Sequence, residues 1–174
     1  MRVTLRLAAP LALLGALLLG ACQRTVIENP EVTNYNPNDL TAELDFWHDL
    51  PGRSAVSNDE GFHGVILLFE GTDSTTSYEE RVAHLKEIGW LQESFDEPAN
   101  LAMQRGTLSR LLVKAMEIKG GVMMQVTHAS PRYAYKELVY LGVMPDGSEL
   151  MVVDGLDYLG IVSRAQDYMV VEGL

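Results

Sequence analysis

Residues 85–91 have the sequence LKEIGWL, and residues 138–144 have the sequence LVYLGVM. In each stretch a helical pattern ends at a glycine, Gly89 or Gly142, that is followed by two apolar residues. Glycine readily takes the left-handed conformation that closes many helices, and the apolar residues after it pack back onto the helix. The two stretches therefore predict two helices that end in the same way.

Another pattern recurs where helices are expected to begin. A polar residue and a glycine open an expected helix at Glu60-Gly61, at Arg105-Gly106 and at Asp154-Gly155. The three glycines lie about 45 to 50 residues apart, a period that suits repeated helical hairpins. We therefore predict a mainly α fold, a compact bundle of about six helices that form three helix–loop–helix units.

Helix boundaries follow from capping residues and apolar periodicity. Ser57 and Ser77 each stand three residues before a glutamate, which is capping-box spacing, and Ser130 precedes a proline that suits a first helical turn. The expected helices cover residues 39–49, 57–70, 77–88, 106–118 and 130–141, and a last one begins at Asp154. Their expected inward residues include Leu40, Leu44, Tyr78, Val82, Ile88 and Leu156, and Val170-Val171 is expected to pack back on the body.

Two segments read less clearly as helix. Residues 122–126, VMMQV, predict a short strand or an extended connector. Residues 145–148, PDGS, predict a turn, which would join residues 143–144 and 150–153 in a small hairpin.

The first 21 residues have the parts of an export signal. Arg2 and Arg6 make the head positive, and an apolar run from Leu7 to Leu19 follows. This run is shorter than the roughly 20 residues that a membrane-spanning helix needs. A cleaved signal is therefore expected rather than a permanent span.

The end of the signal, Leu19-Gly20-Ala21-Cys22, resembles the lipobox of bacterial lipoproteins. The resemblance implies that the Cys22 thiol receives a diacylglycerol group, that the signal is cut before Cys22, and that the new amine is acylated. Cys22 is the only cysteine of the chain, so no disulfide can form within it and no cysteine is left for catalysis. The alternative is an ordinary secretory signal with an incidental cysteine.

The resemblance places the protein in the bacterial cell envelope, bound to the lipid bilayer through Cys22. Gln23 follows the cysteine, where aspartate favours the inner membrane of enteric bacteria, so glutamine favours the outer membrane. Residues 22–38 are rich in Asn, Thr, Glu and Pro and predict an extended tether, and residues 39–174 predict a single helical domain.

The charge of the chain narrows its partners. The net charge is −11, and loss of Arg2 and Arg6 with the signal makes the mature chain two units more negative. Such a charge opposes binding to nucleic acid and to anionic headgroups. An envelope protein or a cell-wall glycan is the expected partner beside the bilayer.

Residues 81–116 and 132–165 resemble degenerate S-layer homology repeats. Those repeats have a first helix that ends in glycine and two apolar residues, and a second helix that opens with a Thr-Arg-Ala-Glu type of motif. The resemblance implies a pseudo-threefold helical domain that binds pyruvylated cell-wall polysaccharide through the motif arginine. Arg105 is matched to that arginine, whereas Glu60 and Asp154 stand at the positions taken as its counterparts and would repel an anionic glycan.

Four cations are the candidate anion-binding or glycan-binding residues: Arg105, Arg110, Arg132 and Lys136. In so acidic a chain they either line a groove for an anion or make internal salt bridges to carboxylates.

The sequence shows no catalytic spacing. The histidines His48, His63, His84 and His128 form no metal-binding pair, and no G-x-S-x-G motif is present. We therefore expect no metal, no cofactor and no enzymatic activity, and predict a binding or scaffolding lipoprotein, with a glycan-binding module as the alternative. A third hypothesis is an enzyme whose site, with His63 or His84 beside a carboxylate, assembles only in the fold.

Overall fold

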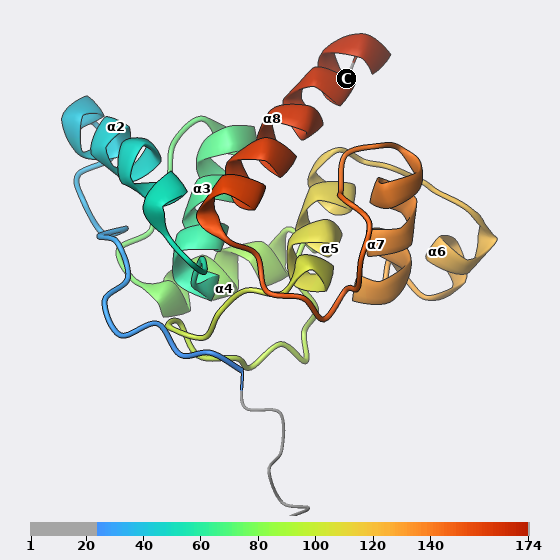
Figure 1. Cartoon of the computed structure of the whole chain (residues 1–174), viewed down its shortest axis with the longest axis horizontal. Helices are drawn as coiled ribbons and strands as arrows, with labels where there is room; N and C mark the ends of the chain where they lie inside the picture. The colour runs from blue at the N-terminus through green and yellow to red at the C-terminus, as the bar shows by residue number, and fades with distance from the viewer. Residues whose placement is uncertain (1–23, 174) are drawn as a thin grey trace, which may run out of the picture.

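The computed structural model describes residues 24–173, and in this part the chain is mainly helical (Figure 1). The predicted mainly α fold is confirmed. Seven α-helices and one short 3-10 helix lie in the described part: α2 (Leu40–Asp49), η2 (Leu50–Gly52), α3 (Asn58–Glu70), α4 (Tyr78–Glu87), α5 (Arg105–Ala115), α6 (Val122–Val126), α7 (Pro131–Tyr140) and α8 (Gly155–Glu172).

Six of these helices form three helix–loop–helix units. The first helices, α2, α4 and α7, are each 10 residues long, and they lead into α3, α5 and α8. Helix α6 is an extra turn and a half between the second and third units. The strand or connector predicted at residues 122–126 is therefore wrong, because so short an apolar run has no periodicity that separates a strand from a helix.

A ring of three backbone hydrogen bonds joins the three units at their centre. Met103 N–H donates to the Val56 carbonyl at 2.8 Å, Val56 N–H to the Val153 carbonyl at 2.9 Å, and Val153 N–H to the Met103 carbonyl at 3.0 Å. All three residues are fully buried. Each unit thus gives one bond to a second unit and takes one from the third, which is a pseudo-threefold arrangement of backbone.

This backbone ring sets the register of the three second helices. Helices α3, α5 and α8 each begin two residues after a ring residue, at Asn58, Arg105 and Gly155. The N–H groups of these three residues donate to the neighbouring unit, at the carbonyls of Leu101, Met151 and Arg53. Arg105 therefore corresponds to Asn58 and Gly155. The counterparts taken from the sequence, Glu60 and Asp154, are wrong, because the backbone ring and not the glycine sets the register.

The helices pack in the same cyclic order. Helix α3 packs on α4, α5 on α7, and α8 on η2, the turn that continues α2. The second helix of each unit therefore lies against the first helical segment of the next unit. Buried apolar side chains from α2 to α8 form one continuous core around this arrangement.

Local capping agrees with the sequence at most helix ends. Glu60 N–H donates to Ser57 Oγ at 3.1 Å and Ser57 N–H to the Glu60 carboxylate at 2.6 Å, which confirms the first capping box. Gly89 and Gly142 have φ of 76° and 75°, and the two residues after each glycine donate to a carbonyl of the helix. The predicted similarity of these two ends is confirmed.

Some helix ends and loops differ from the prediction. Ser77 caps α4, but Glu80 accepts from Thr76 instead of completing a box, and Ser130 makes no side-chain cap. The hairpin at residues 143–153 is not formed. Val152 pairs instead with Gln104 of another unit.

The inward faces of several helices are rotated relative to the prediction. Five apolar residues expected to pack inward are exposed, at fractions of 68–81%: Leu40, Leu44, Leu156, Val170 and Val171. Ile88 is also more than a third exposed. Phe46 on α2 and Arg81 on α4 take buried positions instead. The apolar periodicity predicted where the helices lie in the sequence, but it did not predict which face of each helix packs against the neighbouring units.

The segment predicted as a tether is not a free spacer in its described part. Residues 24–35, here called the N-terminal strap, run extended along the body (Figure 1). Ile27 N–H donates to the Asn100 carbonyl at 2.7 Å, and Ala102 N–H donates to the Thr25 carbonyl at 2.8 Å. Residues 22 and 23, at the start of the predicted tether, lie outside the described residues.

Replacing Gly155 by alanine tests the register that the backbone ring sets. A Cβ at Gly155 would lie 1.7 Å from the Leu50 carbonyl oxygen, which belongs to backbone and cannot rotate away. We expect Gly155→Ala to lower the free energy of unfolding by about 3 kcal/mol, measured by urea denaturation. Gly52→Ala is the control, because a Cβ there meets no atom within 4 Å. Equal stability of the two variants would contradict the close approach of α8 to η2.

Candidate functional site

The four cations predicted to form one groove lie in different environments. Arg105 and Arg110 are buried on α5, whereas Arg132 and Lys136 are exposed on α7. The structure brings Arg132 and Lys136 together and separates Arg110 from them. Cys22, the predicted lipidation site, lies outside the described residues.

Arg132 and Lys136 line a cavity of about 300 Å³ beside α7, together with Tyr135, Asp146 and Glu149. Arg132 makes a 3.2 Å ion pair with Glu149. The two carboxylates balance the two cations, so this cavity offers no clear preference for an anion.

Arg105 is committed to contacts within the protein. Its guanidinium pairs with Asp157 and donates to the Asp146 carbonyl at 3.2 Å. The internal salt-bridge interpretation therefore describes Arg105 and Arg132.

Arg110 is held differently, by backbone carbonyls alone. Its Nη1 donates to the carbonyls of His128 and Ala129 at 2.6 and 2.7 Å, and its Nε is buried without a hydrogen-bond partner. Among the described residues no carboxylate pairs with it, and burial lowers the pKa of its guanidinium.

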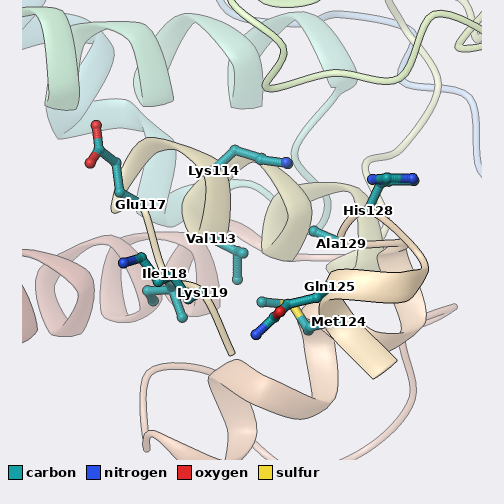
Figure 2. Close-up of a pocket in the computed structure, with 9 residues that line it drawn as sticks. All are labelled: Val113, Lys114, Glu117, Ile118, Lys119, Met124, Gln125, His128 and Ala129. Carbon is teal, nitrogen blue, oxygen red and sulfur yellow. The ribbon is translucent and has the colours of Figure 1, made fainter. Parts of the chain in front are cut away.

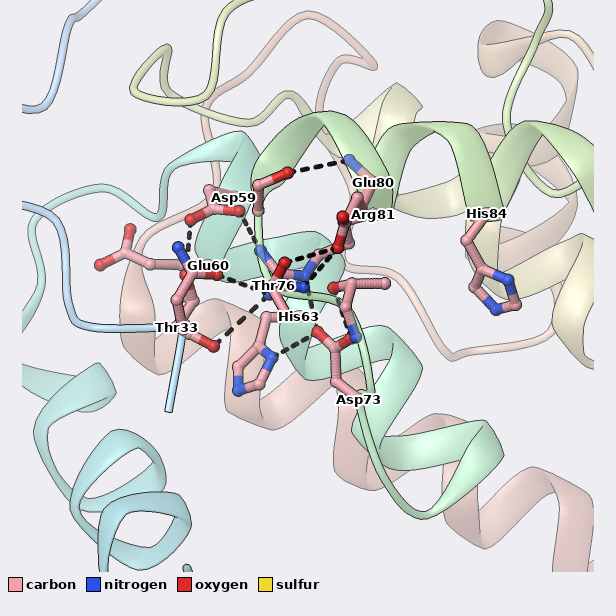
Figure 3. A network of polar contacts seen from close by, with 12 residues as sticks. Thr33, Asp59, Glu60, His63, Asp73, Thr76, Glu80, Arg81 and His84 are labelled. Carbon is pink, nitrogen blue, oxygen red and sulfur yellow. Dashed lines mark hydrogen bonds and ion pairs between the residues drawn. The ribbon is translucent and has the colours of Figure 1, made fainter. Parts of the chain in front are cut away.

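The most connected polar site is a buried cluster around Arg81, which sequence reasoning missed (Figure 3). Arg81 on α4 is fully buried, and its guanidinium pairs with Asp59 of α3 and with Asp73 of the α3–α4 loop. The bond from Nε to Asp73 is 2.6 Å long. Two carboxylates thus surround one buried cation, and we call this group the Arg81 cluster.

His63 extends the Arg81 cluster toward the N-terminal strap. Its Nδ1 lies 2.7 Å from the Asp73 carboxylate, and its Nε2 lies 2.7 Å from the Tyr35 hydroxyl. An ionised carboxylate only accepts hydrogen bonds, so Nδ1 carries the hydrogen. In the neutral ring Nε2 is then the acceptor for the Tyr35 hydroxyl.

The surroundings of the Arg81 cluster set the protonation states of Asp73 and Tyr35. Burial acts to raise the pKa of Asp73, but hydrogen bonds from His63 and Thr75 and the charge of Arg81 outweigh it and hold that pKa well below its usual range. Burial, with Glu43 and Asp73 nearby, raises the pKa of Tyr35 to about 12. At neutral pH Asp73 is therefore ionised and Tyr35 keeps its proton.

The N-terminal strap closes the Arg81 cluster on its outer side. Thr33 donates its hydroxyl hydrogen to Asp59 at 2.6 Å, and Arg81 Nη2 donates to Asn34 Oδ1 at 3.2 Å. Glu31 N–H donates to buried Glu60 at 2.8 Å. Because buried charges need partners to offset their lost hydration, the strap completes the coordination of groups that would otherwise meet water.

The Tyr35–His63–Asp73 order resembles a hydroxyl, imidazole and carboxylate relay. Its geometry does not favour nucleophilic chemistry, because the pKa of the hydroxyl is raised and His63 is almost fully buried. Two cavities of the described part, of about 350 and 300 Å³, are lined by other residues. The arrangement fits a lock between the strap and the body better than a reaction centre.

His84 also lies beside a carboxylate, at 2.7 Å from Glu70, but both side chains are about one-third exposed on the surface. Within residues 24–173 no three His, Cys, Asp or Glu side chains gather in a way that could hold a metal ion. None of the helices in that range combines the length and apolar character that a membrane span requires.

One signal for the Arg81 cluster was present in the sequence. Arg81 lies three residues after Tyr78 and four before Leu85, so it falls on the apolar stripe of α4. A charge at such a position indicates a buried partner. Asp73 carried no comparable signal, because it lies in an irregular polar loop.

Comparisons with protein-family models, with curated proteins and with solved structures give no match for this chain.

Replacing Asp73 by asparagine tests the Arg81 cluster. We expect Asp73→Asn to lower the free energy of unfolding by about 3 kcal/mol at pH 7, because it removes one partner of a buried charge. A carboxyl whose pKa is lowered by folding stabilises the protein above its unfolded pKa of about 4, and loses this contribution as the pH falls further. The difference between the natural protein and the variant should therefore narrow below about pH 4 in urea unfolding.

Glu70→Gln is the control for this measurement, because it removes a carboxylate from the exposed pair with His84. We expect a change of less than about 1 kcal/mol. A comparable loss in both variants, or a difference for Asp73→Asn that widens in acid, would contradict the buried ion pair.

Proposed function

We propose that this protein is a lipid-anchored lipoprotein of the bacterial envelope that acts by binding or scaffolding and not by catalysis. The observation that carries the proposal is the sequence Leu19-Gly20-Ala21-Cys22 after an apolar run too short to span a bilayer. The acidic charge of the chain supports an anchor made of lipid, since basic patches cannot supply one.

The N-terminal strap adds a geometric consequence to this proposal. Arg24 is only two residues from Cys22, and it pairs with Glu97 and donates to the Ala102 carbonyl at 2.8 Å. Two residues span at most about 7 Å. An acylated Cys22 would therefore hold the body close to the bilayer, with one preferred side toward it, which suits a scaffold with a fixed orientation.

The sealed Arg81 cluster supports the non-catalytic part of the proposal. The best candidate for an acid–base relay, His63 with Asp73, is used to attach the strap to the body. Its hydrogen-bonding capacity is taken up by Tyr35, Thr75 and Arg81. A substrate would have to displace these contacts before it reached the imidazole.

Replacing Cys22 by serine tests the anchor. We expect the natural protein to incorporate radiolabelled palmitate and to sediment with membranes, and Cys22→Ser to lose the label and move to the soluble fraction. Gln23→Ala is the matched control and should remain labelled and membrane-bound. Undiminished labelling of Cys22→Ser, or a native protein whose mass lacks the acyl groups, would contradict the proposal.

The backbone ring favours a second candidate function, a surface-glycan module of the S-layer homology type. Its pseudo-threefold arrangement of three helical units is the architecture that the sequence resemblance implies. The chemistry is less favourable, because Arg105 is paired with Asp157 and its counterparts are Asn58 and Gly155. At the position of the motif arginine, at most one of the three units therefore carries a cation.

Co-sedimentation with purified cell-wall polysaccharide separates the two candidates. A glycan module should be retained at low salt, and Arg105→Gln should reduce retention about tenfold while its circular dichroism remains helical. Lys86→Gln is the control, since Lys86 lies in the last turn of α4 and not at the position matched to the motif arginine. No retention of the natural protein would end the second candidate and leave the first in place.

A further inference from the structure

A cavity of about 350 Å³ lies between the C-terminal part of α5 and helix α6. Its apolar wall comes from Val113, Ile118, Met124 and Ala129. Figure 2 shows the side chains of Val113 and Met124 pointing toward one another between the two helices. The volume lies in the range of small-molecule sites and is too small for a folded partner. We call this hollow the α5–α6 cavity.

The wall of the α5–α6 cavity contains strained backbone. Three non-glycine residues of the described part have positive φ, Glu117 at 54°, His128 at 51° and Ala129 at 56°, and all three line this cavity. Glu117 and His128 follow the ends of α5 and α6 and close them as Gly89 and Gly142 close α4 and α7, with N–H groups that donate to the Lys114 and Gln125 carbonyls. A non-glycine residue is less favourable than glycine in this left-handed conformation, so the surrounding structure must hold it in place.

Arg110 provides the contact that holds this backbone. Its Nη1 donates to the carbonyls of two of these residues, His128 and Ala129. Arg110 is only 8% exposed, and among the described ion pairs it has no carboxylate partner. Its charge is therefore not neutralised locally and acts on the cavity through poorly hydrated protein, where screening is weak.

Further positive charge lies on the lining itself. Lys114 and Lys119 both line the α5–α6 cavity, and neither takes part in an ion pair of the described residues. Glu117 is the one carboxylate among the lining residues. In a chain whose net charge is −11, a hollow with two lysines and a buried arginine behind it is a local reversal of charge.

We propose that the α5–α6 cavity binds a small aliphatic monocarboxylate, with its chain along the apolar wall, of which Ile118 is the partly exposed residue, and its carboxylate beside the two lysines. The apolar wall argues against an inorganic anion, which would gain nothing from it, and the charge argues against a neutral or cationic ligand. This site goes beyond the proposed anchoring function and does not depend on acylation of Cys22.

Calorimetric titration with octanoate tests the proposal. The full chain in phosphatidylcholine nanodiscs is titrated, and empty nanodiscs provide the reference for partition into lipid. We expect saturable binding of octanoate that weakens about threefold to fourfold for each methylene removed, since a buried methylene contributes about 0.8 kcal/mol. Octanol and octylammonium have the same chain without the negative charge and should bind at least tenfold more weakly.

Three variants locate the site. The double variant Lys114→Gln/Lys119→Gln should weaken octanoate binding about fivefold to tenfold, and Lys86→Gln, outside the cavity, should leave it unchanged. Glu117→Gln removes the one lining carboxylate and should strengthen binding about twofold to threefold, a gain that unfolding cannot produce. Added salt should reduce the effect of the lysines, because exposed charges are screened.

Some results would overturn the proposal. These are no saturable octanoate binding above that of empty nanodiscs, equal binding of octanol, or an affinity that does not change in the lysine and Glu117 variants. Octanoate binding in a Cys22→Ser chain that keeps an undiminished palmitate label would support this site although the anchoring proposal had failed. Loss of the label with no octanoate binding would contradict this site alone.

Discussion

The backbone ring of Val56, Met103 and Val153 is the constraint on which the rest of the structure depends. Each of its three N–H groups lies in a fully buried residue, where an unpaired donor would cost about 1–3 kcal/mol. Each of these N–H groups donates to a carbonyl of another unit. A unit on its own would therefore leave the N–H group of its ring residue without a partner. The three units therefore form one cooperative domain although their sequences differ, and the second helix of each unit begins two residues after its ring residue.

The two sites described above lie where the chain departs from that threefold plan. Between α5 and α7 the chain inserts α6, and the α5–α6 cavity forms beside this insertion. Before α2 the chain adds the N-terminal strap, which completes the Arg81 cluster. The three repeated units form the filled core. The N-terminal strap completes the Arg81 cluster, and helix α6 forms one side of the α5–α6 cavity.

Much of the fold could be predicted because helix ends are specified locally. The capping box of Ser57 and Glu60 and the glycine ends at Gly89 and Gly142 need only a few neighbouring residues. Helix orientation could not be predicted in the same way, since it depends on units distant in sequence. Arg81 is buried because the strap and α3 cover one side of α4, whereas Leu44 on α2 is exposed. The candidate sites were harder still, as Asp73 and Arg110 meet their partners only in the fold.

Arg110 shows why a set of cations in the sequence does not identify one groove. Arg105, Arg132 and Lys136 lie near carboxylates of the third unit, which neutralise them or balance their cavity. Arg110 lies on the same helix as Arg105 but points to carbonyls, whose partial charges stabilise a guanidinium without cancelling its net charge. At the proposed α5–α6 site the cations are therefore ones for which the described residues supply no ion-pair partner, namely Arg110, Lys114 and Lys119. That property depends on three-dimensional neighbours, and for this reason we propose anion binding at the α5–α6 cavity and not at the groove that the sequence suggested.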